Sequence, residues 1–392
     1  MDKMTKNNRI AFLNDVLLNS LSFFIYILGQ QLLFMPLMGK WLTEGIYANF
    51  IIFISVFAIL SNSLGNELGI VSQIIEQKVN FQKILHFIAF ISFCVTVIIL
   101  YYLNFNFLDT VLLSLSVFLA NYRLFYSGYF RKNSLFRNVL VINILYLIGI
   151  CFGLAVYRLT YLIWSPLLLA ELISLIYIFC YQNKLEEDNI PISKENVKTF
   201  LNFSLISFLN NLITYLDKII IYPILGPTAV SIYYSTASMS KVVNLVTNPL
   251  HGVLLNWIKN DGNRNNIIKK FIVATMPIIV ISSIISIPIT YFAMKLLYSQ
   301  FLPQGNQLIV PVSLALGISI GTSLLKSVLL KFIDSKIVLR IFIFYFLSFV
   351  ILAYVSSNLF GLVGFSYSVF ISKCILLIGF ISPLIKLKEA KG

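Results

Sequence analysis

Ionisable side chains inside long apolar segments are the part of this sequence with the most chemical information. The cations are Arg123, Lys218, Lys241, Lys326 and Lys373, and the acids are Asp15, Glu67, Glu171 and Asp217. A charge at the centre of a hydrocarbon layer costs at least ~2.5–3.5 kcal/mol, so such groups are usually paired or face a hydrated cavity. We therefore predict that these residues line a polar, mildly cationic cavity that suits an anionic ligand.

Depth within the apolar segment separates these residues into two classes. Lys241, Lys373 and Glu171 fall near the middle of their segments, and the two lysines are the strongest candidates for ligand contact. Glu171 could instead neutralise one of those lysines. The others lie nearer to segment ends, where a long side chain such as that of Lys218 can extend to the membrane interface. Asp217 could then be a structural partner of Lys218, or the two could form a gate.

Polar residues at helical spacing form stripes along three of the apolar segments. The members are Asp15, Asn19, Ser22, Tyr26 and Gln30; then Ser207, Asn210, Thr214 and Asp217; then Ser231, Ser235, Ser238 and Lys241. Steps of three and four residues place each set on one helical face. Such residues often only hold membrane helices together. Because the three stripes also contain ionisable groups, we predict that they face the cavity, with Gln30 and Asn210 among its lining residues.

The composition indicates the kind of protein that positions these residues. The chain has 392 residues, of which 59% are hydrophobic and 11% charged, whereas a soluble domain has roughly 25% charged residues. A membrane-spanning helix needs about 20 apolar residues. The sequence predicts an all-α polytopic membrane protein with twelve spans, at 11–37, 42–66, 82–102, 107–130, 138–157, 160–181, 199–222, 228–256, 270–293, 304–332, 338–356 and 361–385.

The distribution of Lys and Arg predicts the topology. Clusters of basic residues recur in alternate linkers. The intervening linkers contain only three basic residues, Lys40, Arg158 and Lys295. By the positive-inside rule, both termini are cytoplasmic. The most polar stretch, 182–198, is expected to be a cytoplasmic linker between two six-helix lobes at 1–181 and 199–392. The formal net charge of +14 is spread among these linkers, which argues against nucleic acid as a partner.

The two predicted lobes show a short internal similarity. "GQQLLFMPLMGKWLTEGIY" from Gly29 aligns with "LDKIIIYPILGPTAVSIYY" from Leu216. The alignment pairs Pro36 with Pro223, Gly39 with Gly226, and Tyr47 with Tyr234. Gln30 and Gln31 align with Asp217 and Lys218. Because the equivalent elements are six spans apart, this similarity predicts a parallel repeat about an axis along the membrane normal.

The sequence lacks the residue patterns that several kinds of catalytic or metal site require. Its two histidines, His86 and His251, form no paired ligand motif, and its four cysteines have no metal or redox spacing. No phosphate-binding G-x-x-x-x-G-K-[ST] loop is present, which argues against direct ATP hydrolysis. The predicted outer linkers are short, which disfavours a membrane-embedded glycan polymerase. We expect a protein that is not an enzyme and that needs no cofactor or metal.

The motif "LDKIIIYPILGPTAVSIYYSTASM", with Asp217, Lys218, Gly226 and Tyr233, together with the two-lobed layout, resembles the flippases of O-antigen and polysaccharide repeat units. That family belongs to the superfamily of multidrug and toxin extrusion (MATE) proteins. The resemblance implies a MATE-like fold and alternating access. It also implies that the substrate is an undecaprenyl-diphosphate-linked oligosaccharide, carried from the cytoplasmic to the periplasmic leaflet of a bacterial inner membrane.

The resemblance further implies H⁺ or Na⁺ as a coupling ion and polysaccharide assembly proteins as possible partners. Lys218, Lys241 and Lys373 correspond only loosely to a cationic cavity of that family. Diphosphate or acidic-sugar contact is expected of Lys241 and Lys373, with Arg123, Lys326, Gln30 and Asn210 also lining the cavity. Charge balance or ion coupling is expected of Asp217, Glu171, Asp15 and Glu67. The alternative reading is an ion-coupled multidrug exporter of the same superfamily.

Overall fold

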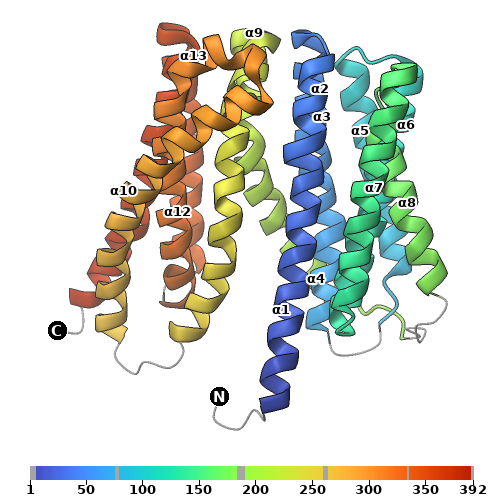
Figure 1. Ribbon diagram of the computed structural model, residues 1–392. Helices are drawn as coiled ribbons and strands as arrows, with labels where there is room; N and C mark the ends of the chain where they lie inside the picture. The colour runs from blue at the N-terminus through green and yellow to red at the C-terminus, as the bar shows by residue number, and fades with distance from the viewer. Residues whose placement is uncertain (1–5, 76–78, 183–189, 259–263, 333–334, 390–392) are drawn as a thin grey trace. The chain divides into compact units, whose positions relative to one another are not determined.

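The computed structural model describes residues 6–75, 79–182, 190–258, 264–332 and 335–389, and their fold is helical (Figure 1). Side chains are described over the same ranges, except chiefly at 6–13, 239–258 and 264–270. The chain forms two compact units. Unit 1 comprises 1–38 and 49–216, and unit 2 comprises 39–48 and 217–392.

The helices of unit 1 follow the predicted apolar segments closely. They are α1 (Lys6–Ile27), the π-helical turn η1 (Leu28–Phe34), α2 (Met35–Trp41), α3 (Glu44–Ser61), the π-helical turn η2 (Asn62–Asn66), α4 (Glu67–Ile74), α5 (Gln82–Tyr102), α6 (Phe107–Lys132), α7 (Phe136–Thr160), α8 (Ser165–Gln182) and the beginning of α9 (Lys194–Ile258). Residues 39–48, between α1 and the body of α3, are part of unit 2.

Close helix packing in unit 1 depends on small residues. A Cβ atom at Gly149 of α7 would lie 2.4 Å from the Cα atom of Ala170 of α8, so glycine is required for this approach. Buried apolar side chains of α4 to α8, among them Leu68, Phe130 and Val139, form a core cluster in unit 1. The tight α7–α8 contact positions Glu171, the residue after Ala170, inside the unit.

Unit 2 contains the remainder of α9 and the helices α10 (Arg264–Leu297), η3 (Ser299–Phe301), α11 (Leu302–Gly305), η4 (Asn306–Leu308), α12 (Ile309–Phe332) and α13 (Ser335–Glu389). Two of its helices are broken at a glycine, Gly226 in α9 with φ 83° and Gly361 in α13 with φ 61°. Positive φ is readily accessible to glycine but costly for other residues. Both breaks fall where the sequence predicts one span to end and the next to begin.

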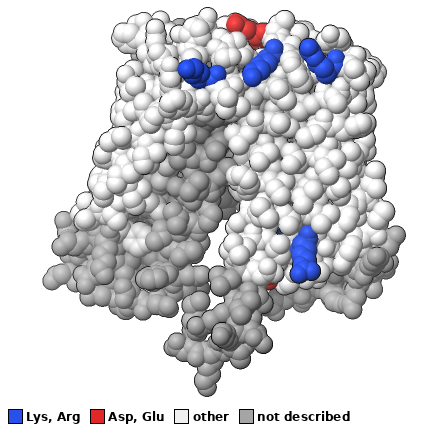
Figure 2. Space-filling model, viewed as in Figure 1, with Lys and Arg blue, Asp and Glu red and all other residues white. Residues whose placement is uncertain are grey.

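Nine helical segments in the described part of the chain are long and apolar enough to cross a membrane. One of them, Arg340–Ile385, has 46 residues and includes the break at Gly361. At 1.5 Å per residue, such a length exceeds one ~30 Å hydrocarbon layer about twofold. The predicted number of twelve spans remains a prediction. On the face shown in Figure 2, the charged side chains that are visible lie toward the ends of the helices, as expected for a membrane protein.

The predicted lobe boundary and the boundary between the compact units differ. The described end of the predicted linker, residues 190–198, lies within unit 1, and the chain passes into unit 2 at Asp217, within α9. The part of α9 before Asp217 packs within unit 1, where the Asn211 amide donates a hydrogen bond to Ser63 Oγ at 3.3 Å. Polar composition predicts exposure of a segment, but it carries no information about its packing partner.

Candidate functional site

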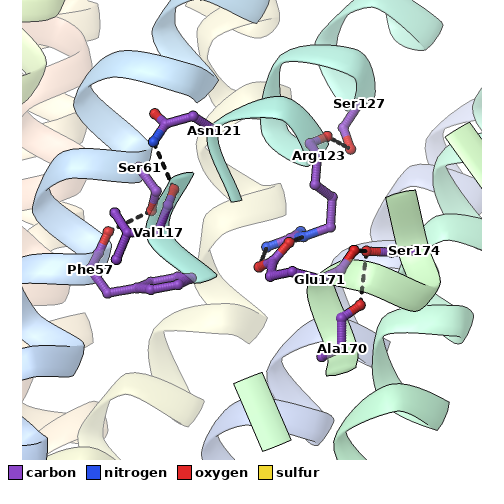
Figure 3. A network of polar contacts seen from close by, with 9 residues as sticks. All are labelled: Phe57, Ser61, Val117, Asn121, Arg123, Ser127, Ala170, Glu171 and Ser174. Carbon is purple, nitrogen blue, oxygen red and sulfur yellow. Dashed lines mark hydrogen bonds and ion pairs between the residues drawn. The ribbon is translucent and has the colours of Figure 1, made fainter. Parts of the chain in front are cut away.

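A buried ion pair between Arg123 of α6 and Glu171 of α8 forms the polar centre of unit 1 (Figure 3). Arg123 Nε donates to Glu171 Oε2 at 2.7 Å, and a terminal guanidinium nitrogen donates to Oε1 at 3.1 Å. The exposed fractions of the two side chains are 2% and 0%. A bidentate geometry of this kind is among the strongest hydrogen-bonded pairs in proteins. Glu171 therefore neutralises a cation, but that cation is Arg123 and not one of the mid-span lysines.

Two tyrosines complete the surroundings of the guanidinium. Arg123 Cζ lies 5.1 Å from the ring centroid of Tyr26 in α1 and 4.4 Å from that of Tyr146 in α7. Both distances are in the range of cation–π attraction. The Tyr146 hydroxyl is buried and has no hydrogen-bond partner among the described residues. Four helices, α1, α6, α7 and α8, thus meet at one cation, which acts as a polar core for unit 1.

The polar stripe of α1 is used for helix packing over much of its length. Arg131 Nε donates to Asn19 Oδ1 at 3.1 Å, and Asn143 Nδ2 donates to Ser22 Oγ at 2.7 Å. Ser22 Oγ in turn donates to the Val139 carbonyl at 3.1 Å. Asn19, Ser22 and Tyr26 therefore hold α1 against α6 and α7. For these three residues the structure shows the packing role of such stripes, and their exposure to a cavity stays a prediction.

Gln30 and Asp15, the other predicted site residues of α1, lie in different environments. Gln30 is buried within the π-helical turn η1. Such turns inside α-helices are frequent at functional sites, because they widen the backbone locally. Asp15 is half-buried, and the ion pairs recorded among the described residues do not include it. Their predicted roles in substrate or ion binding remain predictions.

A second polar group in unit 1 surrounds the π-helical turn η2. Glu67 follows this turn directly, is half-buried, and hydrogen-bonds to the Ser207 hydroxyl of α9. Asn211 Nδ2 donates to the Ser207 carbonyl at 2.9 Å. On the opposite side, Asn121 Oδ1 of α6 accepts from the Gly65 amide at 2.9 Å, which satisfies a backbone donor in the turn. The side chain of Asn210, predicted to line the cavity, lies outside the described residues.

In unit 2, Asp217 and Lys218 form an ion pair. The sequence analysis considered Asp217 as a structural partner of Lys218, and this pairing agrees with that interpretation. Lys218 is 1% exposed, so its side chain is enclosed by the protein. The Tyr233 hydroxyl, also in α9, hydrogen-bonds to the Asp217 carboxylate. The ring of Tyr233 packs edge-on against Phe365 of α13, with ring centroids 5.2 Å apart. The pair is therefore anchored to a second helix of unit 2 through an aromatic contact.

Lys326 of α12 and Lys373 of α13 are close enough to influence each other electrostatically. Lys326 Nζ lies 5.3 Å from the ring centroid of Phe342, and Lys373 Nζ lies 5.2 Å from that of Tyr345. Both lysines are half-buried. Within the part of the chain that the structure describes, neither forms an ion pair with a carboxylate. Two neighbouring cations held against aromatic rings are an arrangement that can accept an anionic group.

The side chain of Lys241 lies outside the described residues, so its predicted ligand contact is not placed. Tyr146, Tyr233 and Tyr345 were not among the predicted site residues, although each lies beside one. The spacing of these three tyrosines does not distinguish them in the sequence, because aromatic residues are abundant throughout the apolar segments. No group of three or more His, Cys, Asp or Glu side chains that could hold a metal ion occurs in the described part of the chain.

No protein-family model matches the chain, and no curated protein is significantly similar to it in sequence. Several solved structures are similar in fold. A multidrug resistance MATE family transporter of the MOP superfamily, in an inward-facing conformation, has a TM-score of 0.74 at 13% sequence identity; the alignment covers 95% of this chain and 100% of that one. An outward-facing MATE family transporter of that superfamily has a TM-score of 0.67 at 13% identity, with 99% of each chain covered.

The lipid II flippase MurJ, in an inward closed conformation, has a TM-score of 0.67 at 16% identity, covering 94% of this chain and 87% of that one. At these identities the similarity shows the fold. The chain is an all-helical, multi-pass membrane protein with a MATE-like fold. The structures that are similar to it are transporters and a flippase, not enzymes.

Proposed function

We propose that this protein flips an undecaprenyl-diphosphate-linked oligosaccharide, an O-antigen or capsule repeat unit, from the cytoplasmic to the periplasmic leaflet by alternating access. The observation that carries the proposal is the pair of half-buried lysines, Lys326 and Lys373, held against aromatic rings. A diphosphate needs cationic partners in a site of low polarity. The fold shared with a lipid II flippase supports a lipid-linked substrate.

The alternative, an ion-coupled exporter of cationic drugs, is favoured by the fold shared with multidrug transporters. Such an exporter would need carboxylates that are available to a cation. Two of the four acids predicted in the membrane zone, Glu171 and Asp217, are instead neutralised by Arg123 and Lys218. This use of the acids favours an anionic passenger. Glu67 and Asp15 then remain as candidates for coupling to H⁺ or Na⁺.

A deletion strain tests the proposed function. Loss of the gene should cause lipid-linked repeat units to accumulate on the cytoplasmic side and surface glycan to disappear. The double variant Lys326→Ala/Lys373→Ala should fail to restore surface glycan at normal protein level. The matched control is Lys295→Ala, because Lys295 is an exposed lysine at the end of α10 and should be dispensable. Normal glycan with altered drug tolerance in the deletion strain would favour the exporter instead.

A further inference from the structure

A hydrogen-bonded pair of polar rings lies on the surface of unit 1. Nδ1 of His86 in α5 and the hydroxyl of Tyr122 in α6 are 2.5 Å apart, and the ring centroids are 5.7 Å apart. His86 is exposed and Tyr122 is half-buried. The ring of Phe118, one helical turn before Tyr122, packs against it with centroids 5.2 Å apart. Because the hydrogen bond uses Nδ1, the Nε2 atom of this exposed imidazole is available to a group outside the protein.

The surface of α5 next to this pair is apolar. Phe87, Phe90 and Ile98 have exposed fractions of 65%, 61% and 67%. The helix is long and apolar enough to cross a membrane, so these side chains face lipid acyl chains. Acyl chains offer no hydrogen-bond partner, and a polar group in such surroundings is costly without one. A polar partner for His86 must therefore come from the headgroup region of the bilayer.

The position of His86 along α5 places it near that region. It lies four residues after Gln82, where the helix begins, which corresponds to about 6 Å along the helix axis. The linker before α5 belongs to the basic side of the chain, which the positive-inside rule predicts to be cytoplasmic. The pair is thus expected where the headgroups of the cytoplasmic leaflet meet the acyl chains.

A cation lies beside the pair. Lys83 is exposed and precedes His86 by three residues, so the two side chains share one face of α5. The ion pairs recorded among the described residues do not include Lys83. An ammonium group and an imidazole nitrogen can both donate hydrogen bonds to a phosphate. Basic sites between helices on the cytoplasmic side of membrane proteins bind anionic lipid headgroups. The charge and the apolar surface together therefore match an anionic lipid.

We propose that Lys83, His86 and Tyr122 form a binding site for the headgroup of an anionic glycerophospholipid of the cytoplasmic leaflet. The lipid phosphate accepts hydrogen bonds from Lys83 Nζ and His86 Nε2, and Tyr122 orients the imidazole through Nδ1. The acyl chains lie along the exposed phenylalanines of α5. A ligand that binds only the folded protein stabilises it, so this lipid raises the stability of unit 1. The proposal does not depend on the substrate of the proposed function.

The alternative is that the hydrogen bond only fastens α5 to α6. That interpretation explains the contact between His86 and Tyr122, but it gives no role to Lys83 and no reason for the exposure of the imidazole. The two interpretations differ in one measurable respect. Only a lipid site requires that replacement of Lys83, which is not part of the hydrogen bond, weakens the binding of an anionic lipid.

Native mass spectrometry of the purified full-length protein in detergent tests the site, with a thermal unfolding scan as the second measurement. The probes are dioleoyl phosphatidylglycerol, dioleoyl phosphatidylcholine and inorganic phosphate. Phosphatidylglycerol should bind and raise the Tm, whereas the other two probes should do neither. Lys83→Ala and His86→Leu should each weaken phosphatidylglycerol binding about tenfold, as expected for the loss of one hydrogen bond to a charged group.

Two matched variants control for charge. Lys83→Arg keeps the cation and should bind phosphatidylglycerol like the unaltered protein. Arg137→Ala removes an exposed cation of α7 on the same predicted side of the membrane and should also leave binding unchanged. Because Lys83 is exposed, Lys83→Ala should have an unchanged Tm in the absence of lipid, which separates a loss of binding from a loss of the fold.

Several results would overturn the proposal. Failure of phosphatidylglycerol to bind the unaltered protein would exclude the site. Equal binding of phosphatidylcholine would show that only the apolar surface matters, and equal stabilisation by inorganic phosphate would indicate a site for a soluble anion. If phosphatidylglycerol binds Lys83→Ala and His86→Leu as tightly as it binds the unaltered protein, the hydrogen bond between His86 and Tyr122 serves only to fasten α5 to α6.

Discussion

Units 1 and 2 each bury an ion pair, and the two pairs are constructed differently. In unit 1, Arg123 and Glu171 come from helices α6 and α8, with tyrosines of α1 and α7 on the guanidinium. In unit 2, Asp217 and Lys218 are neighbours on α9. The first pair can form only when α6 and α8 pack together, whereas the second is available as soon as one helix forms. A buried charge can thus be compensated either by the tertiary structure or by the sequence itself.

This difference bears on what each unit can do. The charges at the centre of unit 1 are neutralised within the unit by a rigid arrangement of helices. Unit 2 neutralises one lysine locally and leaves Lys326 and Lys373 beside aromatic rings. We therefore expect the polar centre of unit 1 to contribute to stability and the lysines of unit 2 to contribute to substrate binding.

The largest expected effect is that of Arg123→Met. It leaves the Glu171 carboxylate buried without its partner, and breaking a buried ion pair in this way costs about 3–5 kcal/mol. Chemical denaturation in bicelles would measure the loss in the free energy of unfolding. The double variant Arg123→Met/Glu171→Leu should recover most of it, because it removes both charges. If the single variant is as stable as the unaltered protein, the ion pair does not support unit 1.

Asp217→Asn should have a smaller effect on stability. The Lys218 ammonium loses its charged partner but keeps an amide oxygen beside it, so the expected cost is that of an imperfectly satisfied buried group, about 1–3 kcal/mol. The same denaturation measurement applies. A loss as large as that of Arg123→Met would show that the locally formed pair is as important as the tertiary one, and the contrast between the two units would fail.

Tyr146→Phe should stabilise unit 1 slightly. The buried Tyr146 hydroxyl has no hydrogen-bond partner among the described residues, while the ring faces the guanidinium. Replacement by phenylalanine removes an unsatisfied group and keeps the ring, which we expect to add up to about 1 kcal/mol to the free energy of unfolding. Tyr146→Leu is the control, since it also removes the cation–π contact and should be destabilising. A destabilised Tyr146→Phe would mean that the hydroxyl is satisfied, for example by a water molecule.

The smallest effect on stability is expected for Lys373→Met, which retains the aliphatic part of the side chain against Tyr345. We expect a change of less than about 0.5 kcal/mol, as for many substitutions that break no buried pair. Transport should nevertheless fall. A variant that unfolds as easily as Arg123→Met would place Lys373 among the residues that support the fold rather than among those that bind substrate.

Some features of the site could be predicted from the sequence because they depend on neighbours along the chain. The apolar segments, the breaks near Gly226 and Gly361, and the possibility of an Asp217–Lys218 pair all follow from composition and local spacing. The stripe of α1 was also visible as a periodicity. The role of this stripe cannot be predicted from the sequence, because a polar helical face has the same periodicity whether it contacts another helix or water.

The sequence alone therefore determined that this is a helical membrane protein with charges inside its apolar segments. Only the tertiary structure decided that Arg123 is the partner of Glu171, 48 residues away, and that residues 39–48 are seated in unit 2. The physical reason is that periodicity and hydropathy are properties of one segment at a time. The choice of a partner for a buried charge or an aromatic side chain depends on which segments pack together, and this is settled by the shapes of all the helices at once.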